Sequence, residues 1–439
     1  MANKNIQEIS DNYLCSACGA CYAICNHDAI LFKWSSIGRK FAQVDNDKCV
    51  ECGLCKKVCP SIDSLSLHER FPNIYVGNIL NTYSGRATDD LIFRNAQSGG
   101  VCTSIIKYLF DTKRIDCAIM CKMTAGISPD VSAVVINSPA DLYSCQKSCY
   151  TFVDVLSVLK KTEDKESIAI VGIPCHIEGA SLLSEQFKKF SNIKYKIGLI
   201  CDRIECKGMQ DALVSLARGK KKILQWRKKD FCHKNIYYTY KNAPCVILDE
   251  NEKIRGVFPN QFRFALKDMF TSPRCRLCYD KLNIHADIVL GDPWGMTNID
   301  WQHGESLVIT RTQTGESLIR DLLRDNYVRL HKRIDYSEVL KGQHIYQKTQ
   351  EREEYMAVYN SVIGYDKSFL AINTNKIAST NKMKEFSDFI EREKRTESEN
   401  KKEAQCIIKA IESKEQPVKV FLRRIKWFVK NHIKSYIQR

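Results

Sequence analysis

Two runs of cysteines near the start of the chain have a spacing that suits iron–sulfur chemistry. The first is Cys15-x2-Cys18-x2-Cys21-x3-Cys25, and the second is Cys49-x2-Cys52-x2-Cys55-x3-Cys59, followed by Pro60. A 4Fe-4S cluster takes four thiolates, and where two such runs stand together the fourth cysteine of each run binds the other cluster. We therefore predict one cluster on Cys15, Cys18, Cys21 and Cys59, and a second on Cys49, Cys52, Cys55 and Cys25.

Zinc is the alternative occupant of paired CxxC motifs. Both runs read Cys-x2-Cys-Gly-x-Cys, and Gly19 and Gly53 would let backbone N–H groups come close to cluster sulfurs. This repeat favours iron–sulfur over zinc. Asn26 stands where the usual signature has proline, which leaves the ligands in place. The segment Phe32–Val44 is predicted to form the small hairpin of a bacterial-ferredoxin-type module.

Four further cysteines lie at predicted strand ends or in a CxxC motif. They are Cys175, Cys201, Cys275 and Cys278. Four thiols are the number that one more 4Fe-4S cluster needs, here from distant parts of the chain. A CxxC dithiol, a structural zinc site and, for Cys175, a plain buried thiol are the alternatives.

Two other features suit cofactor or proton chemistry. The stretch Ser98-Gly99-Gly100-Val101-x-Thr103 runs into an apolar helix, whose exposed N–H groups would suit a phosphate, although a Gly-Gly turn is often only a turn. His176, next to Cys175, is the first candidate for a proton donor, and Asp292 is the second. A structural histidine is the alternative for His176.

Composition places the chain among ordinary globular proteins of a reducing compartment. Of its 439 residues 44% are hydrophobic and 27% charged, and the 21 cysteines follow no apparent signal peptide. We therefore expect a cytoplasmic protein with thiols as metal ligands or buried groups. No apolar stretch reaches the ~20 residues of a membrane span. The net charge of +16 raises the question of nucleic acid, but no nucleic-acid-binding signature is present, so none is expected as a partner.

Apolar and helical patterns alternate between Asn73 and residue 345, which predicts an α/β domain with a mixed sheet. The predicted strands are Cys117–Cys121, Val131–Ile136, Ile168–Gly172, Lys194–Cys201, Ile236–Tyr240, Ile288–Leu290 and Ser306–Thr310. The predicted helices are Gly100–Asp111, Tyr150–Lys161, Ile177–Phe187, Met209–Arg218 and Gly315–Asn326. We expect three parts: a two-cluster module over 1–70, a flavin and iron–sulfur domain over 71–345, and a helical basic extension over 346–439.

The C-terminal extension divides into two segments. Residues 376–416 are rich in Lys, Glu, Asn and Ser with helical spacing, which predicts a solvated helix or a partly disordered arm. Residues 417–439 hold seven Lys or Arg and no acid, with apolar residues at three- and four-residue steps. Such a basic amphipathic helix suits peripheral contact with the anionic inner face of a membrane. The alternative is a helix that packs on its own domain or on a partner.

The order of the middle motifs resembles the beta subunit of coenzyme F420 hydrogenases and dehydrogenases. The resemblance covers roughly residues 10–340. The motifs that carry it are Ser98-Gly-Gly100-x2-Thr103, Gly172-x-Pro174-Cys175, Gly198-x2-Cys201, Cys275-x2-Cys278 and Asp287-x3-Gly291-Asp292-x-Trp-Gly. It implies an FAD held by Ser98, Gly99, Gly100, Thr103 and the Pro174 turn, beside one cluster on Cys175, Cys201, Cys275 and Cys278. Of these ligands Cys175 could instead line the flavin pocket.

One departure concerns a Gly-Ser-Lys-Tyr turn common in that family. Here the turn reads Lys147-Ser148-Cys149-Tyr150, with cysteine in the lysine position. Lys147, two residues earlier, is the candidate replacement as a flavin or substrate contact.

The leading hypothesis is an FAD and iron–sulfur oxidoreductase that exchanges electrons with a redox partner protein or ferredoxin and acts on an unknown small molecule. The resemblance extends to bacterial proteins linked to surface polysaccharides, so polysaccharide biosynthesis is one setting. The alternative is an electron-transfer subunit that reduces a partner enzyme and has no substrate site. A zinc-stabilised scaffold is the third hypothesis. FAD can exchange two electrons at once, and a cluster exchanges one. The flavin and the clusters together would therefore convert between two-electron and one-electron transfer.

Overall fold

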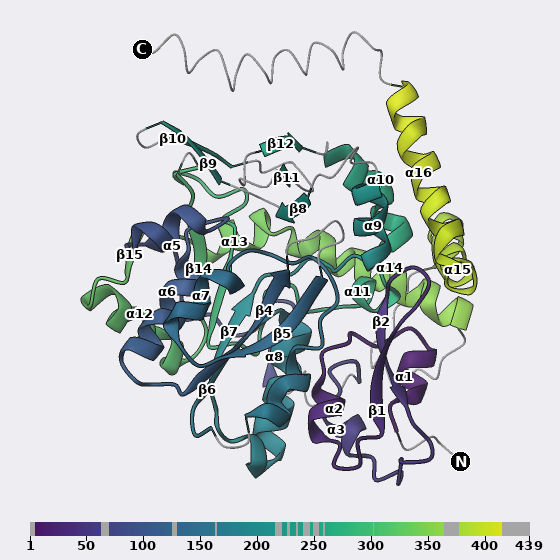
Figure 1. Ribbon diagram of the computed structural model, residues 1–439, viewed down its shortest axis with the longest axis horizontal. Coiled ribbons are helices and arrows are strands. Elements are labelled where there is room, and N and C mark those ends of the chain that lie inside the picture. Colours follow the sequence, from purple (N-terminus) through teal and green to yellow (C-terminus); the bar gives the residue numbers. More distant parts are fainter. Residues whose placement is uncertain are drawn as a thin grey trace.

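The computed structural model describes the N-terminal module, the central domain and the first helices of the C-terminal extension (Figure 1). The described residues are 5–62, 70–124, 130–162, 165–215, 222–225, 229–233, 236–239, 246–248, 254–257, 260–301, 303–363 and 377–414. The basic segment 417–439, predicted as an amphipathic helix, lies outside these residues.

The N-terminal module is a small hairpin with short helices on either side. Strands β1 (Ile30–Trp34) and β2 (Lys40–Val44) pair antiparallel, which confirms the predicted hairpin. The helices are α1 (Gln7–Asp11), α2 (Ala20–Ile24) and α3 (Leu54–Lys57). Helices α2 and α3 each begin directly after a glycine in the left-handed region, Gly19 at φ 95° and Gly53 at φ 77°.

An eight-stranded mixed sheet forms the centre of the main domain and confirms the predicted α/β class. Its strand order is β15-β3-β14-β13-β7-β6-β4-β5. The strands are β3 (Asn81–Ala87), β4 (Cys117–Thr124), β5 (Asp130–Ile136), β6 (Ile168–Gly172), β7 (Ile193–Leu199), β13 (Ile288–Gly291), β14 (Ser306–Thr310) and β15 (Val328–Arg333). All five residues of β6 and of β14 are buried, as expected for strands covered on both faces.

Strand direction brings the cysteine and glycine motifs to one edge of this sheet. Strands β4, β6, β7 and β13 are parallel, and β3 runs the same way because β14 is antiparallel to both β13 and β3. The carboxyl ends of these strands therefore lie along the same side of the sheet, here called its carboxyl edge, which is where α/β proteins bind ligands. Ser98, Cys175, Cys201 and Asp292 all follow strands that end there.

Helices cover both faces of the sheet. On one face α6 (Val101–Asp111) and α12 (Gln313–Arg324) share a buried core with the sheet. On the other, α8 (Pro174–Gln186) and the 3-10 helix η2 (Val155–Lys161) share a core with the sheet and with α2 of the N-terminal module. The short elements around them are α5 (Asp90–Asn95), α7 (Leu142–Cys145), α11 (Pro273–Arg276), α13 (Tyr336–Gly342), η1 (Pro139–Asp141) and η3 (Lys188–Phe190).

The N-terminal module thus completes a core that the main domain begins. The N–H of Leu156 donates to the carbonyl of Cys18 at 2.9 Å. Gly19 lies so close to η2 that an added Cβ would come within 2.5 Å of the nitrogen of Ser157. Figure 1 shows the module, in purple, lying beside α8.

The structure corrects two sequence predictions in the main domain. The predicted helix Tyr150–Lys161 is wrong over its first turn, because Tyr150 has φ 47° and only the 3-10 helix η2 forms. The predicted strand Ile236–Tyr240 forms as β10 (Ile236–Thr239), but it pairs with β9 (Lys229–His233) outside the main sheet. A separate three-stranded sheet contains β8 (Lys222–Gln225), β11 (Val246–Leu248) and β12 (Ile254–Val257).

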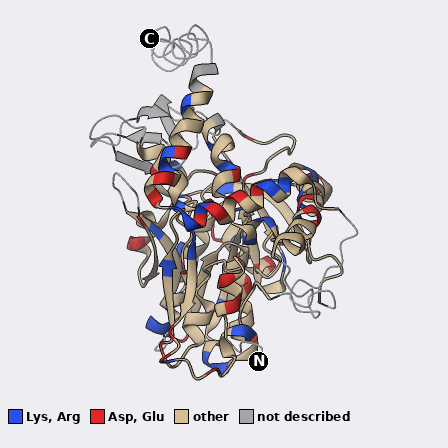
Figure 2. Ribbon diagram, turned by 90° about the vertical axis from the view of Figure 1, so that its right-hand side faces the viewer, with Lys and Arg blue, Asp and Glu red and all other residues tan. Residues whose placement is uncertain are grey.

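Residues 376–416 were predicted as a solvated helix or a partly disordered arm. Their described part is helical, as the first alternative requires, but it packs on the protein, which corrects the expected solvation. Helices α14 (Ile345–Ile363), α15 (Thr380–Lys394) and α16 (Glu397–Lys414) follow one another. Phe386 and Phe389 of α15 and Ala404 and Ile408 of α16 are buried. The two helices join a core with α9 (Lys207–Ser215) and α10 (Asn260–Phe270). Lys or Arg and Asp or Glu lie side by side along these helices (Figure 2).

A buried ion pair connects α15 to the N-terminal hairpin. Arg39 donates to Glu393 from Nε at 3.2 Å and from Nη2 at 3.1 Å, and only 4% and 9% of the two side chains are exposed. A bidentate pair of this kind is strongly destabilised when one partner is lost, because the other charge stays buried.

We predict that Arg39→Met lowers the free energy of unfolding by roughly 3–5 kcal/mol, measured by anaerobic chemical denaturation. The matched control is Lys384→Met, which breaks an exposed pair with Asp388 and should cost about 0–1 kcal/mol. Equal effects of the two substitutions would contradict a stabilising role for the buried pair.

A buried histidine lies where the chain enters the main domain. The ring of His285 packs edge-on against Phe71, with ring centres 5.2 Å apart. Burial, followed by the charges of Arg70, Lys196 and Arg311, lowers the pKa of His285 to about 3. The unfolded chain therefore binds a proton at higher pH than the folded chain does.

Stability from a neutral His285 is present above pH ~6.5 and is lost as the pH falls toward the folded pKa. We predict that the wild-type chain loses about 2 kcal/mol more unfolding free energy than His285→Phe between pH 7 and pH 5. The same slope in the wild-type chain and in His285→Phe would rule out the titration of His285.

Candidate functional site

The two N-terminal cysteine runs have the same backbone shape. The residue before each second cysteine has positive φ, Ala17 at 55° and Glu51 at 51°, and each second cysteine is followed by a left-handed glycine. The internal repeat in the sequence is therefore a repeat in conformation. Backbone N–H groups of Ala17 and Ala42 both lie 3.4 Å from the sulfur of Cys15, as expected for loops that wrap around a cluster.

The structure brings Cys59 back to the first run, as the predicted ligand sets require. After burial, which is the largest cause, the charges of Cys18 and Cys15 raise the pKa of Cys59. Cys55 is influenced in the same way by Cys52 and Cys49 of its own run. Cys25 packs in one small cluster with cysteines of both runs, namely Cys15, Cys21, Cys49, Cys55 and Cys59.

These thiols are suited to a metal centre and poorly suited to being free thiolates. Burial raises the pKa of Cys18 to about 12. A thiol of this kind ionises only when a nearby positive charge, such as iron, stabilises the thiolate. In the part of the chain that the structure describes, no three His, Cys, Asp or Glu side chains converge closely enough to hold a single metal ion.

The four other candidate cysteines line one cavity. Cys175 lies in the first turn of α8, Cys201 follows β7, and Cys275 and Cys278 lie in and just after α11. Three chain segments thus place four thiols around one space. Burial, then the neighbouring thiols, raises the pKa of both Cys175 and Cys201.

This cavity touches the N-terminal module. Ser16, between Cys15 and Cys18, contributes to its lining. On the neighbouring helix α8, a Cβ added to Gly179 would lie 3.5 Å from the sulfur of Cys18, and the charge of Cys18 acts on Cys175. The first cysteine run and the four-cysteine cavity are therefore direct neighbours.

Arg274 joins the two cysteine groups. It is buried, and it donates from Nη2 to the carbonyl of Pro60 at 2.8 Å and from Nε to Ser61 Oγ at 2.9 Å, directly after Cys59. Burial opposes its charge, but Cys278, Glu178 and Cys175 raise its pKa above the usual value. Its position keeps a positive charge between thiols of both groups.

A second buried cation, Lys348 on α14, donates to the carbonyls of Asp202 at 2.9 Å and Cys275 at 3.3 Å. Sequence reasoning missed both cations. For Arg274 the only signal was its place next to Cys275, and for Lys348 there was none.

Two of the groups predicted to hold a phosphate, on Ser98 and Gly99, already make hydrogen bonds within the protein. Ser98 Oγ donates to the carbonyl of Glu305 at 2.6 Å, and the N–H of Gly99 donates to Ser306 Oγ at 3.0 Å. Gly100 has φ 81° and precedes α6, which has no side-chain cap. Thr103 is buried in the first turn of that helix. The first-turn N–H groups of α6 are therefore the part of this motif that suits an anion.

The Lys147 turn lies beside that motif. Lys147 has φ 98°, and the next residue, Ser148, donates its N–H to Gln97 Oε1 at 3.0 Å. Cys149, in the position where the family has lysine, is a largely buried thiol whose pKa is raised to about 12 by burial and by Cys145. Two motifs some 50 residues apart thus meet at the same edge of the sheet.

The two candidate proton donors follow different strands. His176 follows β6 and Asp292 follows β13, and β7 lies between these strands. His176 is buried against Gly172, and the backbone of Val153 interacts with its ring. Burial lowers its pKa to about 4, so the ring is neutral at pH 7. Pro174, in the first turn of α8, lines the four-cysteine cavity.

The described helices include none long and apolar enough to cross a membrane.

Comparisons with known proteins agree with this arrangement. Residues 82–160 and 165–335 match the N-terminal and C-terminal family models of the coenzyme F420 hydrogenase/dehydrogenase beta subunit. Residues 8–67 match a 4Fe-4S dicluster domain.

Several named proteins are similar over most of the chain. A subunit of the F(420)H(2) dehydrogenase of Methanosarcina mazei is 25% identical over 333 residues, covering 73% of this chain and 85% of that protein. The coenzyme F420-dependent sulfite reductase of Methanocaldococcus jannaschii is 24% identical, covering 82% of this chain and 54% of that protein. The coenzyme F420 hydrogenase subunit beta of Methanothermobacter thermautotrophicus is 24% identical, covering 55% and 82%.

A solved structure shares the fold. A chain of the F420-reducing [NiFe] hydrogenase complex from Methanosarcina barkeri aligns with a TM-score of 0.50 at 18% identity, covering 70% of this chain and 97% of that one. With both halves of the family model matched in order behind a dicluster domain, this chain belongs to the family of coenzyme F420 hydrogenase/dehydrogenase beta subunits, which are iron–sulfur electron-transfer proteins.

Proposed function

We propose that this chain is an oxidoreductase that relays electrons between its dicluster module and a third 4Fe-4S cluster held by Cys175, Cys201, Cys275 and Cys278, with FAD beyond. One observation carries the proposal: the four cysteines line a single cavity that Ser16 of the first cysteine run also lines.

The residues around the cavity fit a cluster. The four thiols come without a disulfide among them. A 4Fe-4S cluster with four thiolates carries net negative charge and exchanges one electron at a time. Buried Arg274 and Lys348 would offset that charge and favour the reduced state.

The burial of the cysteines suggests the order in which the proposed clusters lie, from the protein surface to the interior. Cys52 of the second run is exposed, whereas Cys18 of the first run is buried against α8. The second run therefore offers the surface entry or exit, and the first run lies between it and the four-cysteine cavity. A redox protein or ferredoxin would contact the chain near Cys52.

FAD is proposed at the carboxyl edge of the sheet, where it would exchange electrons in pairs as well as singly. The uncapped first turn of α6, reached through Gly100 and Thr103, would hold a phosphate. Lys147 and Pro174 would flank the cofactor on neighbouring turns.

The second candidate is an electron-transfer subunit without its own substrate. Two of the similar proteins carry the word subunit in their names, which favours a partner enzyme as the electron acceptor. Reoxidation of the reduced flavin by a purified small molecule, in the absence of other proteins, would select the first candidate.

We predict that anaerobically prepared protein contains about twelve irons and one FAD, and that Cys275→Ser lowers iron to about eight because one cluster is lost. Iron, acid-labile sulfide and acid-released FAD are measured on the same sample. Cys406→Ser, at an exposed cysteine of α16, is the matched control and should keep full iron.

About eight irons in the wild-type chain, with no change in Cys275→Ser, would refute the third cluster. Full iron without flavin would refute the FAD assignment alone and leave the relay intact.

A further inference from the structure

A pocket on the far side of the Gly99 turn combines several cationic side chains. It has a volume of about 450 Å³ and is lined by Arg86, Ala87, Thr88, Asp90, Phe93, Arg94, His303 and Arg329. These residues come from β3, α5, β15 and the loop before β14. The volume lies within the ~300–1,000 Å³ usual for small-molecule sites.

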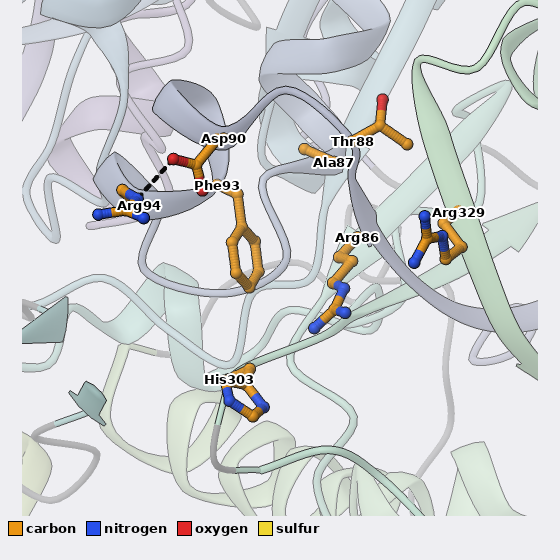
Figure 3. A pocket seen from close by; sticks show the side chains of 8 residues that line it. All are labelled: Arg86, Ala87, Thr88, Asp90, Phe93, Arg94, His303 and Arg329. Carbon is orange, nitrogen blue, oxygen red and sulfur yellow. Dashed lines mark ion pairs between the residues drawn. The ribbon is translucent and has the colours of Figure 1, made fainter. Parts of the chain in front are cut away.

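Arg86 and His303 are held in place from behind. Asp300, which does not line the pocket, lies 3.4 Å from Arg86 Nη1 and 2.8 Å from His303 Nδ1. The guanidinium of Arg86 also lies 5.2 Å from the ring centre of Phe93. Figure 3 shows Arg86, Phe93 and His303 directed into the same space. Their orientation is therefore fixed before any ligand arrives.

Two more guanidinium groups flank this centre. Arg94 forms an exposed pair with Asp90 at 2.6 Å on α5, and exposed Arg329 lies on β15 (Figure 3). Three arginines and a histidine thus meet two carboxylates, those of Asp90 and Asp300, which leaves an excess of positive charge. Guanidinium groups bind phosphate oxygens in a bidentate manner, and their charge persists at any physiological pH.

The pocket borders the proposed flavin seat but has its own lining. The N–H of Ala87, which lines the pocket, donates to the carbonyl of Gly99 at 2.8 Å, so the end of β3 is a wall that the pocket shares with the Gly99 turn. The residues that line the pocket include none of those assigned above to clusters or flavin.

We propose that this pocket binds a phosphate-bearing small molecule of about mononucleotide size. The inference goes beyond the proposed function, since it stands on the pocket's own charges and shape and needs neither the third cluster nor FAD.

Isothermal titration calorimetry of the full-length, anaerobically prepared protein tests the proposal, with ADP, inorganic pyrophosphate and adenosine as probes. ADP and pyrophosphate should bind and compete, and adenosine should not. Arg329→Gln should weaken ADP binding about tenfold or more, because one charged hydrogen-bonding group is lost. Arg320→Gln, at an exposed arginine of α12 outside the pocket, should bind ADP as the wild type does.

Three results would overturn the proposal: no binding of either phosphate probe, equal loss of affinity in Arg329→Gln and Arg320→Gln, or equal binding of adenosine and ADP. Acid-released FAD is measured in each variant. Loss of FAD from Arg329→Gln would show that the pocket belongs to the flavin seat and would overturn the assignment of a separate site.

Discussion

The contact between the loop of Cys18 and helices η2 and α8 is the constraint on which the rest of the molecule depends. At this contact the backbone of Cys18 accepts a hydrogen bond from Leu156, and Gly19 approaches Ser157 more closely than any other residue type allows. The N-terminal module is therefore a layer of the main domain's core. One consequence is electronic, because it puts the first cysteine run against the four-cysteine cavity.

Burying so many cysteines as thiolates has an electrostatic cost, which nearby cations and, in our account, iron offset. The thiols of Cys18, Cys175 and Cys201 are held in surroundings that oppose ionisation. Arg274 and Lys348 are buried beside them and offer positive charge without access to water. The same burial shields the proposed centres from solvent, which helps to set their reduction potentials. The C-terminal helices contribute to this shielding, since α14 supplies Lys348 and α15 clamps the hairpin through Glu393.

Features written in local sequence were predictable. The cysteine runs, the hairpin between them and six of the eight strands of the main sheet follow from short-range spacing, and the structure has them. Strands β3 and β15 were not predicted. Long-range features were not predictable. Arg274 donates a hydrogen bond to Ser61, which is 213 residues away in the sequence, and no local pattern predicts that contact. The positive φ of Tyr150 prevents the predicted helix Tyr150–Lys161 from starting at that residue. The backbone turns there instead, and Gln210 donates a hydrogen bond to the Tyr150 carbonyl. The sequence around Phe386 and Phe389 is so rich in charge that it predicted a solvated helix or a partly disordered arm. A helix forms there, yet both rings are buried. The proposed site divides in the same way. The four distant cysteines were predicted as one ligand set, whereas the buried cations beside them, Arg274 and Lys348, were visible only in the fold.

The central claim is that a third cluster lies next to the cluster of the first cysteine run. Electron paramagnetic resonance of the fully reduced, anaerobic protein tests it most directly, because neighbouring paramagnetic clusters split and broaden each other's signals. The account predicts a spin-coupled spectrum that simplifies to that of a dicluster module in Cys275→Ser. A wild-type spectrum already identical to that of Cys275→Ser would contradict it.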